Sequence, residues 1–442
     1  MNIALVVLDT LRKDVFDEQF GWLPGRRFER AWATSNWTAP VHASLFTGYY
    51  ASEIGVHSRA TILDCEETVL AEHLSAAGYT TRAFSANPNV SKRFEFHRGF
   101  DEFSGSWKIR HFNHENLFDW SGFISETRGE GPRRYLRALR QCLSGDVDTV
   151  ASLKQGFQLK FRPDRLGSDM VDDGARAALD LVRSTDFGSD EFLFINLMEA
   201  HGPYEPPEAY RTVEHAKPTA VDALAGTAGD VDESAVRQAY RDAVRYLSDV
   251  YQDILEALRR EFDYVFTISD HGEMLGEHGL WDHQYGVYPE LTHVPLVVTG
   301  EGLSGSTRDP VSLLDVHRTV LDLAGVDAFS RGQNVLDDPG RECLTEYHGM
   351  TQWLLDELAA VTDIEAVRER YDTELYGIAL PPSYYGHESN EGWRESGRGD
   401  GDPRERLDAL RTDLVRRELD GENAQRDLSD EAMERLRDLG YA

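Results

Sequence analysis

Three short segments of the chain combine carboxylate, imidazole and hydroxyl side chains in a way that suits a divalent metal. Asp270 and His271 are adjacent, and they offer one hard oxygen ligand and one nitrogen ligand. Asp9 adds a second carboxylate. Thr38 adds a hydroxyl whose pKa a metal would lower, so that it could attack an anionic ester. Together these residues favour metal-assisted ester chemistry, although an Asp-His pair alone also fits an ordinary strand end.

Each of these segments lies beside a predicted secondary-structure element. The apolar runs 264–268 and 2–8 predict buried strands that end just before Asp270 and Asp9. Ligands of open α/β sheets bind at the carboxyl ends of the strands. Thr38 begins an apolar segment with a proline in its first turn and Gly48 at its close, which predicts a short helix with a positive N-terminus.

The same patterns predict the rest of the scaffold. Further strands are expected at 80–86, 192–197, 294–298 and 342–348, and helices at 67–77, 231–262 and 312–324. Segments 13–36 and 386–404 are expected to be loops. Two polar residues follow predicted strands: Asn87, which also fits an Asn-Pro turn, and His201, which also fits a structural histidine in a Gly-Pro loop.

The order of these motifs resembles the sulfatases of the alkaline phosphatase superfamily. The resemblance extends from position 7 almost to the C-terminus, and it rests on VLDTLRKD at 7–14, TAPVHASLFTG at 38–48, SDHGEMLGEHGLW at 269–281 with the following ELTHVPLVV, SLLDVHRTVLDLAGV at 312–326 and the terminal LSDEAMERLRDLGY. It implies an α/β fold with a central, mostly parallel sheet flanked by helices and a smaller C-terminal subdomain. We expect a catalytic domain at 1–337 and the subdomain at 338–442.

The resemblance also implies roles for individual residues. Asp9, Asp270 and His271 would bind the metal, with Thr38 bridging metal and substrate. His201 would contact the transferred group or the leaving oxygen, and Asn87 could donate to a substrate oxygen. His42 and His283 would bind substrate oxygens or protonate the leaving group, since imidazole changes charge near neutral pH.

One divalent ion is expected, with manganese, zinc, calcium and magnesium all open. A second metal on Glu199, His201 and His283 is the alternative. Two carboxylates, an imidazole and an alkoxide would hold one such ion.

Four departures from the family pattern bear on the reaction. The family has a cysteine or serine at position 38, which is oxidised to formylglycine, whereas oxidation of Thr38 would give a ketone; no formylglycine is expected. His42 stands in place of an arginine, His283 in place of a lysine, and Thr10 in place of a second acidic ligand, which weakens the case for calcium. A threonine nucleophile is typical of the phosphodiesterase and nucleotide pyrophosphatase branches.

These departures favour a hydrolase or transferase acting on a phosphoester or phosphonate through Thr38. A sulfuric ester hydrolase that works without formylglycine is the alternative, and a non-catalytic pseudoenzyme is the third. The substrate would be a small anionic ester, with glycan-linked and lipid-linked esters both open. Residues 105–190 follow the family least. They predict a helical insertion, which is either a lid that selects the substrate or a peripheral addition.

The composition limits the cellular compartments and the classes of partner that we expect for this protein. The 442-residue chain has a formal net charge of −32, and only six of its 46 basic residues are lysines. This excess of acidic over basic residues, together with an ordinary content of apolar residues, favours a folded protein that is adapted to high salt, or else an acidic mesophilic protein. Nucleic acid would be repelled. Three cysteines without metal spacing are expected to be reduced, and no signal peptide or membrane span is seen, which predicts a cytoplasmic protein. Its oligomeric state stays open.

Overall fold

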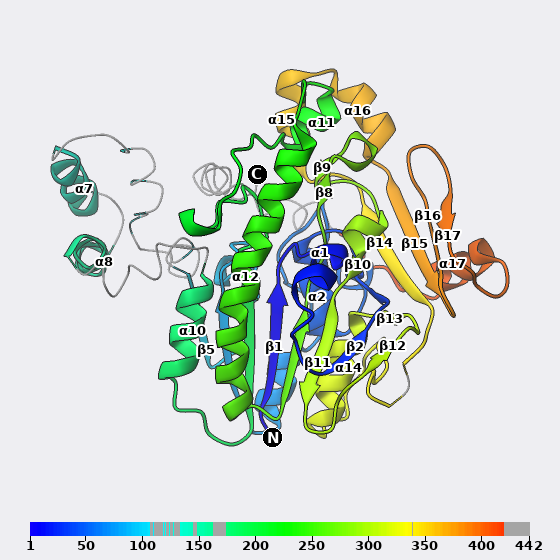
Figure 1. Cartoon of the computed structure of the whole chain (residues 1–442), viewed down its shortest axis with the longest axis horizontal. Helices are drawn as coiled ribbons and strands as arrows, with labels where there is room; N and C mark the ends of the chain where they lie inside the picture. Colours follow the sequence, from blue (N-terminus) through cyan, green and yellow to red (C-terminus); the bar gives the residue numbers. More distant parts are fainter. Residues whose placement is uncertain are drawn as a thin grey trace.

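The computed structural model describes residues 1–106, 133–144, 148–161, 174–337 and 339–419, together with positions 109, 118, 120, 123 and 127. An eight-stranded sheet forms the centre, in the order β12-β2-β11-β7-β1-β6-β4-β5 (Figure 1). Its strands are β1 Ile3–Leu8, β2 Arg26–Phe28, β4 Thr80–Ser85, β5 Glu102–Gly105, β6 Glu191–Leu197, β7 Tyr264–Ile268, β11 Leu296–Gly300 and β12 Ser306–Thr307.

The middle of this sheet is parallel, because β1 pairs in parallel with β6 and β7, and β4 pairs in parallel with β6 and β5. Only β11 runs antiparallel, to β7 and β2. A strand that is covered on both faces reads as a continuous apolar run, and every residue of β1 is buried. The structure confirms the predicted mostly parallel sheet.

Helices cover both faces of the sheet. Ile3, Leu5 and Val7 face one core with α2 Thr38–Thr47, α4 Leu70–Ala76 and α14 Leu314–Leu323. The alternate residues of β1 face a second core with α1 Lys13–Gln19, α10 Ala175–Ser184 and the 29-residue α12 Glu233–Glu261. This alternation follows from the two-residue period of a strand. Figure 1 shows α12 running along β1.

Smaller sheets and helices complete the fold. They are the sheet of β10 His293–Val294, β3 Ala31–Trp32 and β13 Val311–Ser312, the hairpin of β8 Met274–Leu275 and β9 Trp281–Asp282, and the helices α3 Ala51–Ile54, α7 Arg133–Ser144, α8 Thr149–Phe161, α11 Ala220–Ala225, α13 Pro289–Thr292, α15 Gln352–Val361, α16 Ile364–Tyr371 and α17 Pro403–Thr412. Single 3₁₀ turns lie at Lys92–Phe94, Glu208–Tyr210 and Glu277–Gly279.

A separate antiparallel sheet follows the main body. It consists of β14 Cys343–His348, β15 Glu374–Leu380, β16 Tyr384–His387 and β17 Arg394–Ser396. The side chain of Thr345 donates to the backbone oxygen of Ala33 (2.7 Å), so β14 lies against the body. The domain boundary at 337/338 stays a prediction, and the terminal LSDEAMERLRDLGY motif falls on 428–441, outside the described residues.

Two loop predictions were wrong. Segment 13–36 contains α1, β2 and β3, and the latter strands are only three and two residues long, too short for a periodic pattern. Segment 386–404 contains the end of β16, β17 and the start of α17. Pairing of β16 with β15, and of β17 with β16, orders a sequence that is rich in glycine and charge. Within the predicted insertion, α7, α8 and α10 are helical; the lid role stays a prediction.

Candidate active site

Five of the predicted site residues lie at one edge of the sheet. Asp9 follows β1, Asn87 follows β4, His201 follows β6, and Asp270 with His271 follows β7. Since these four strands are parallel neighbours in the order β7-β1-β6-β4, their carboxyl ends meet at this edge.

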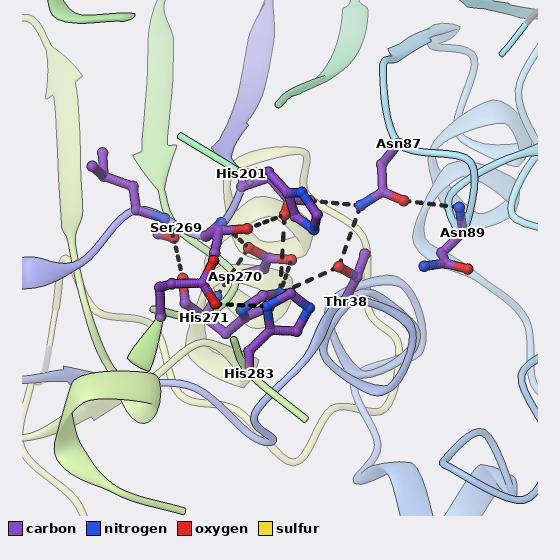
Figure 2. A network of polar contacts seen from close by, with 12 residues as sticks. Thr38, Asn87, Asn89, His201, Ser269, Asp270, His271 and His283 are labelled. Atoms are coloured by element: carbon purple, nitrogen blue, oxygen red, sulfur yellow. Dashed lines mark hydrogen bonds and ion pairs between the residues drawn. The ribbon is translucent and has the colours of Figure 1, made fainter. Parts of the chain in front are cut away.

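Thr38 reaches the same place from the N-terminus of α2. This ten-residue helix ends at Gly48, which has a left-handed φ of 75° and whose N–H closes the last turn on Ser44. The Thr38 hydroxyl oxygen accepts a hydrogen bond from Asn87 Nδ2 (3.2 Å) and lies 3.3 Å from His271 Nε2 (Figure 2). A hydroxyl at a helix N-terminus is well placed to act on an anion.

Asp9, Asp270 and His271 form a compact group of metal-ligand type. One ligand atom from each lies within 4.8 Å of the others, and all three side chains are fully buried. Oδ2 of Asp270 has no hydrogen-bond partner among the described residues. A buried carboxylate oxygen without a partner is costly unless a cation compensates it. The group therefore fits a divalent metal.

The charges of this group agree with that interpretation. Burial and the neighbouring charge of Asp9 raise the pKa of Asp270 to about 7. Burial disfavours a charged His271, but the two carboxylates outweigh it and raise the pKa of that imidazole. Burial alone would also raise the pKa of Asp9, yet His271 and the other nearby histidines lower it. Carboxylates that repel each other in a buried site are relieved by a bound cation.

A second layer of hydrogen bonds holds Asp9 in place. Asn87 and Asn196 both donate to its Oδ2, at 2.8 and 3.1 Å, and the Thr10 hydroxyl donates to its Oδ1 at 2.8 Å. Thr10 adopts a left-handed φ of 61°, and its backbone N–H donates to Oδ1 of Asp270 (3.2 Å). Such a conformation is uncommon for a threonine and tends to occur at functional sites.

His42 lies beneath the site rather than at its surface. Its Nδ1 donates to the backbone oxygen of Thr38 (2.9 Å), and its Nε2 accepts from Asn196 (3.3 Å). The ring has no exposed surface and stands edge-on to Phe194, and burial lowers its pKa to about 4. A neutral ring with both nitrogens engaged is suited to positioning Thr38, not to protonating a leaving group.

His201 and His283 lie next to the metal-ligand group. The His283 ring centroid is 4.5 Å from that of His271 and 5.3 Å from that of His201. Nδ1 of His201 donates to the backbone oxygen of Gly202 (2.9 Å), which fixes the ring. Figure 2 shows these histidines gathered around Asp270.

A buried acid orients His283. Glu273 Oε1 accepts from His283 Nδ1 (3.0 Å), and Glu273 Oε2 accepts from the Tyr204 hydroxyl (2.9 Å). Burial would raise the pKa of Glu273, but His283 outweighs it and lowers that pKa to about 2. Burial together with His271 lowers the pKa of His283 to about 4. The pair is therefore an anionic carboxylate with a neutral imidazole at neutral pH.

A family model described as Sulfatase matches residues 22–326, which is more than half of the chain. The chain belongs to the sulfatase family. Among curated relatives it is 23% identical over 335 residues to the "Uncharacterized sulfatase YidJ" of Escherichia coli, covering 71% of this chain and 63% of the relative. It is 25% identical over 358 residues to the choline-sulfatase of Rhizobium meliloti, covering 74% and 68%. The match thus spans about two thirds of the length of these relatives.

A solved structure shares this sulfatase fold. The phosphonate monoester hydrolase of Agrobacterium radiobacter superposes with a TM-score of 0.59 at 17% identity, covering 99% of this chain and 94% of that chain. At this identity the likeness supports the fold alone, with its central sheet and separate small sheet.

In this sulfatase-family site, the structure adds residues that the sequence pattern did not single out. They are Glu273, Asn196 and Lys217. Glu273 lies within the SDHGEMLGEHGLW motif, so the sequence pattern included this residue but gave it no role. Asn196 is the one amide in the apolar strand β6, and a polar residue in a buried strand can indicate a functional position.

The sequence around Lys217 did not indicate that this lysine belongs to the site, because it lies in a segment without regular secondary structure. It pairs with Asp282, next to His283, and a Cβ on Gly202 would lie 3.1 Å from its Cε, so it packs against the loop that carries His201. Its side chain is 12% exposed. A lysine thus comes close to His283 from another segment, although position 283 itself has lost the lysine of the family pattern.

The alternative second metal site gains no support from this geometry. Glu199 Oε1 accepts from the N–H of Ala175 at the start of α10 (2.6 Å). Among the described residues, Glu199, His201 and His283 do not form a group of metal-ligand geometry, whereas Asp9, Asp270 and His271 do.

Proposed function

We propose that this sulfatase-family protein is a metal-dependent hydrolase that cleaves a phosphoester or phosphonate, or transfers its phosphoryl group, through Thr38. The observation that carries the proposal is the Thr38 hydroxyl beside the buried group of Asp9, Asp270 and His271, 3.3 Å from His271 Nε2. A divalent ion bound there would lower the pKa of the Thr38 hydroxyl and neutralise charge on the transferred group.

The residues around Thr38 support a two-step displacement. Thr38 Oγ1 would give up its proton to solvent and attack the phosphorus, the bond to the leaving oxygen would break, and that oxygen would take up a proton. Water would then attack the threonine ester, release the anion and restore the hydroxyl. Asn87 holds the attacking oxygen by its hydrogen bond, and His42 holds the Thr38 backbone from below.

His283 is our candidate for the group that protonates the leaving oxygen. Its Nδ1–H is fixed by Glu273, so the Nε2 atom is the one left for substrate. An anionic substrate would favour the charged ring, because an opposite charge raises the pKa of an imidazole. His201 and Lys217 would then bind the non-bridging oxygens.

Hydrolysis of a sulfuric ester without formylglycine is the second candidate. It is favoured by the family model and by the choline-sulfatase among the relatives. Thr38 in place of the modified residue and His42 in place of its arginine argue for the phosphorus ester. A pseudoenzyme is disfavoured, since a binding scaffold needs neither the buried acid pair nor the nearby hydroxyl.

The test is a panel of nitrophenyl phosphate, phosphodiester, phosphonate and sulfate esters, assayed in high salt with each divalent metal. We expect the phosphorus esters to be turned over fastest. Thr38→Ala should lower turnover by about three orders of magnitude or more, because the covalent route is lost, while Thr38→Ser keeps substantial activity. Thr412→Ala, an exposed threonine of α17, is the matched control.

Two results would contradict the proposal. Turnover of the sulfate ester well above that of every phosphorus ester would favour the second candidate. Full activity of Thr38→Ala would remove Thr38 from the mechanism.

A further inference from the structure

Helix α7 has the opposite charge to the rest of the molecule. Residues 133–144 contain four arginines and no acidic residue, in a chain whose formal net charge is −32. The next helix, α8, also has no acidic residue and holds Lys154 and Lys160, two of the six lysines in the chain. Residues 133–161 therefore hold six basic residues against two acidic ones.

The same helix exposes a stripe of large apolar side chains. Leu136 and Leu143 are 71% and 62% exposed, and Tyr135 and Leu139 are about two fifths exposed. Positions three, four and seven apart share one face of a helix, so these four residues form a continuous stripe. Arg134 and Arg137 fall on the opposite face, and Arg140 borders the stripe beside Leu136.

Two small residues at the edge of this stripe are buried, and α8 contacts the helix at one of them. Ala138 and Cys142 are buried, and the Thr149 hydroxyl donates to the backbone oxygen of Cys142 (2.8 Å). Val150 and Phe157 of α8 are in turn 78% and 58% exposed. Figure 1 shows α7 and α8 to the side of the main body, beyond α10. The large leucines are thus not needed to hold the pair together.

We propose that α7, with α8 beside it, lies on the surface of a lipid bilayer with anionic headgroups. A helix with arginines on one face and leucines on the other is the type that lies in the interface, with its apolar face among the acyl chains. The charge of this helix complements anionic lipid, whereas the acidic remainder of the chain would be repelled by it. None of the described helices is long and apolar enough to cross a bilayer, so the contact would be peripheral.

Other occupants fit these observations less well. Nucleic acid would engage the arginines but leave the leucines in water. Outside α7 and α8, a second copy offers no comparable apolar face among the described residues, where the other exposed large apolar side chains are dispersed in the sequence: Met1, Phe329, Val361 and Val415. Pairing of α7 with its own copy through the stripe would place two basic helices side by side, with Arg140 at the border of the contact.

The experiment is flotation of the full chain with vesicles of phosphatidylglycerol and, separately, of phosphatidylcholine. It is run at the lowest KCl concentration at which the far-UV circular dichroism of the protein is unchanged. We expect binding to phosphatidylglycerol vesicles and little binding to phosphatidylcholine. A triple variant, Leu136→Ser, Leu139→Ser and Leu143→Ser, should weaken partitioning by roughly tenfold or more. Each of Arg134→Gln and Arg140→Gln should weaken it by up to about fivefold, and less as salt rises.

The matched control removes three exposed apolar side chains elsewhere: Phe329→Ser, Val361→Ser and Val415→Ser should bind as the wild type does. Absence of binding to phosphatidylglycerol, or equal binding by the leucine variant, would overturn the proposal. So would a dimer in light scattering that the leucine variant abolishes, or binding to duplex DNA in place of vesicles. None of these residues belongs to the candidate active site, so turnover of a soluble ester should stay unchanged, and the result does not depend on the proposed chemistry.

Discussion

Thr10 stands beside Asp9 where the family pattern implies a second acidic ligand, and the structure shows what this exchange does. The hydroxyl donates to Asp9, and the backbone N–H donates to Asp270. Both bonds favour the charged carboxylates without adding another negative charge. The site therefore holds two carboxylates in place of three, which suits a smaller ligand set than calcium prefers.

Asp270→Asn should abolish metal binding and leave the fold intact. The burial and the Asp9 charge that raise the pKa of Asp270 to about 7 make its ionisation unfavourable in the metal-free fold. The unfolded value is lower, so metal-free wild-type protein should lose stability as pH rises from about 4 to about 7. The asparagine variant avoids this loss, which is on the order of 2–4 kcal/mol at most.

Metal content and melting curves of metal-free and metal-loaded protein at pH 8 check this prediction. Added metal should raise the melting temperature of the wild type and leave that of Asp270→Asn unchanged. Asp253→Asn, at an exposed acid of α12, is the control and should behave as the wild type. Undiminished metal stoichiometry in Asp270→Asn would show that the ligand assignment is wrong.

Lys217→Met should weaken substrate binding more than it slows turnover. We expect KM for an anionic ester to rise by about tenfold, the usual scale for one charge-assisted contact, with a smaller fall in kcat. Lys154→Met, at an exposed lysine of α8, is the control. An unchanged KM with a large loss of kcat would instead make Lys217 part of the chemical step.

At the scale of elements, the sequence predicted those that carry the strongest patterns. The runs 2–8 and 264–268 are β1 and β7, the helix at Thr38 is α2, and 231–262 is α12 to within two residues at each end. Long periodic segments are reliable because burial on both faces, or on one stripe, dictates every residue type in them. Strands of two or three residues, such as β2 and β3, leave no such trace.

The sequence could predict a site residue only where that residue follows a predicted strand or belongs to a recognisable motif. Asp9, Asn87, His201 and Asp270 follow strands, so their meeting at one sheet edge could be expected. The environment of His42 could not, since a helix position does not say whether a ring faces the site or Phe194 behind it. Lys217 reaches Asp282 through tertiary packing alone.

His348 at the end of β14 lies between two glutamates, and its charge depends on pH. His348 Nε2 lies 3.5 Å from Glu346, its Nδ1 lies 3.6 Å from Glu374, and its ring centroid lies 4.7 Å from that of His57. Burial disfavours a charged His348, but the two glutamates outweigh it and raise its pKa to about 9. Burial and the adjacent His348 lower the pKa of His57 to about 3.

His348→Gln should lose stability at neutral pH and lose less at high pH. A pKa raised from 6.5 to about 9 on folding gives stabilisation that is fully present below pH 6.5 and disappears as pH rises through 9. We expect a cost of about 1–3 kcal/mol at pH 6. Urea unfolding at pH 6 and pH 9.5 measures it, and an equal loss at both values would mean that the packing, not the charge, matters.

The whole molecule combines a large excess of acidic residues with the usual fold of the sulfatase family. The sheet, its two cores and the small C-terminal sheet follow the sulfatase pattern, while the composition includes 78 acidic and 46 basic residues. Several arginines are already engaged in multiple ion pairs, as Arg12 is with Asp14 and Glu277. Such pairs offset only part of the excess, so the remaining surface carboxylates repel one another.

The melting temperature should therefore rise steeply with salt. In dilute buffer the repulsion acts over tens of ångströms, whereas at molar salt the screening length is about 3 Å. We expect an increase of more than about 10 °C between dilute buffer and multimolar KCl, a gain of a few kcal/mol for a domain of this size. Sucrose strengthens burial without screening charge, so it serves as the control and should give a smaller rise. A melting temperature that is the same in dilute buffer and in multimolar KCl would refute adaptation to high salt, and an equal rise in sucrose would assign the effect to burial instead of charge.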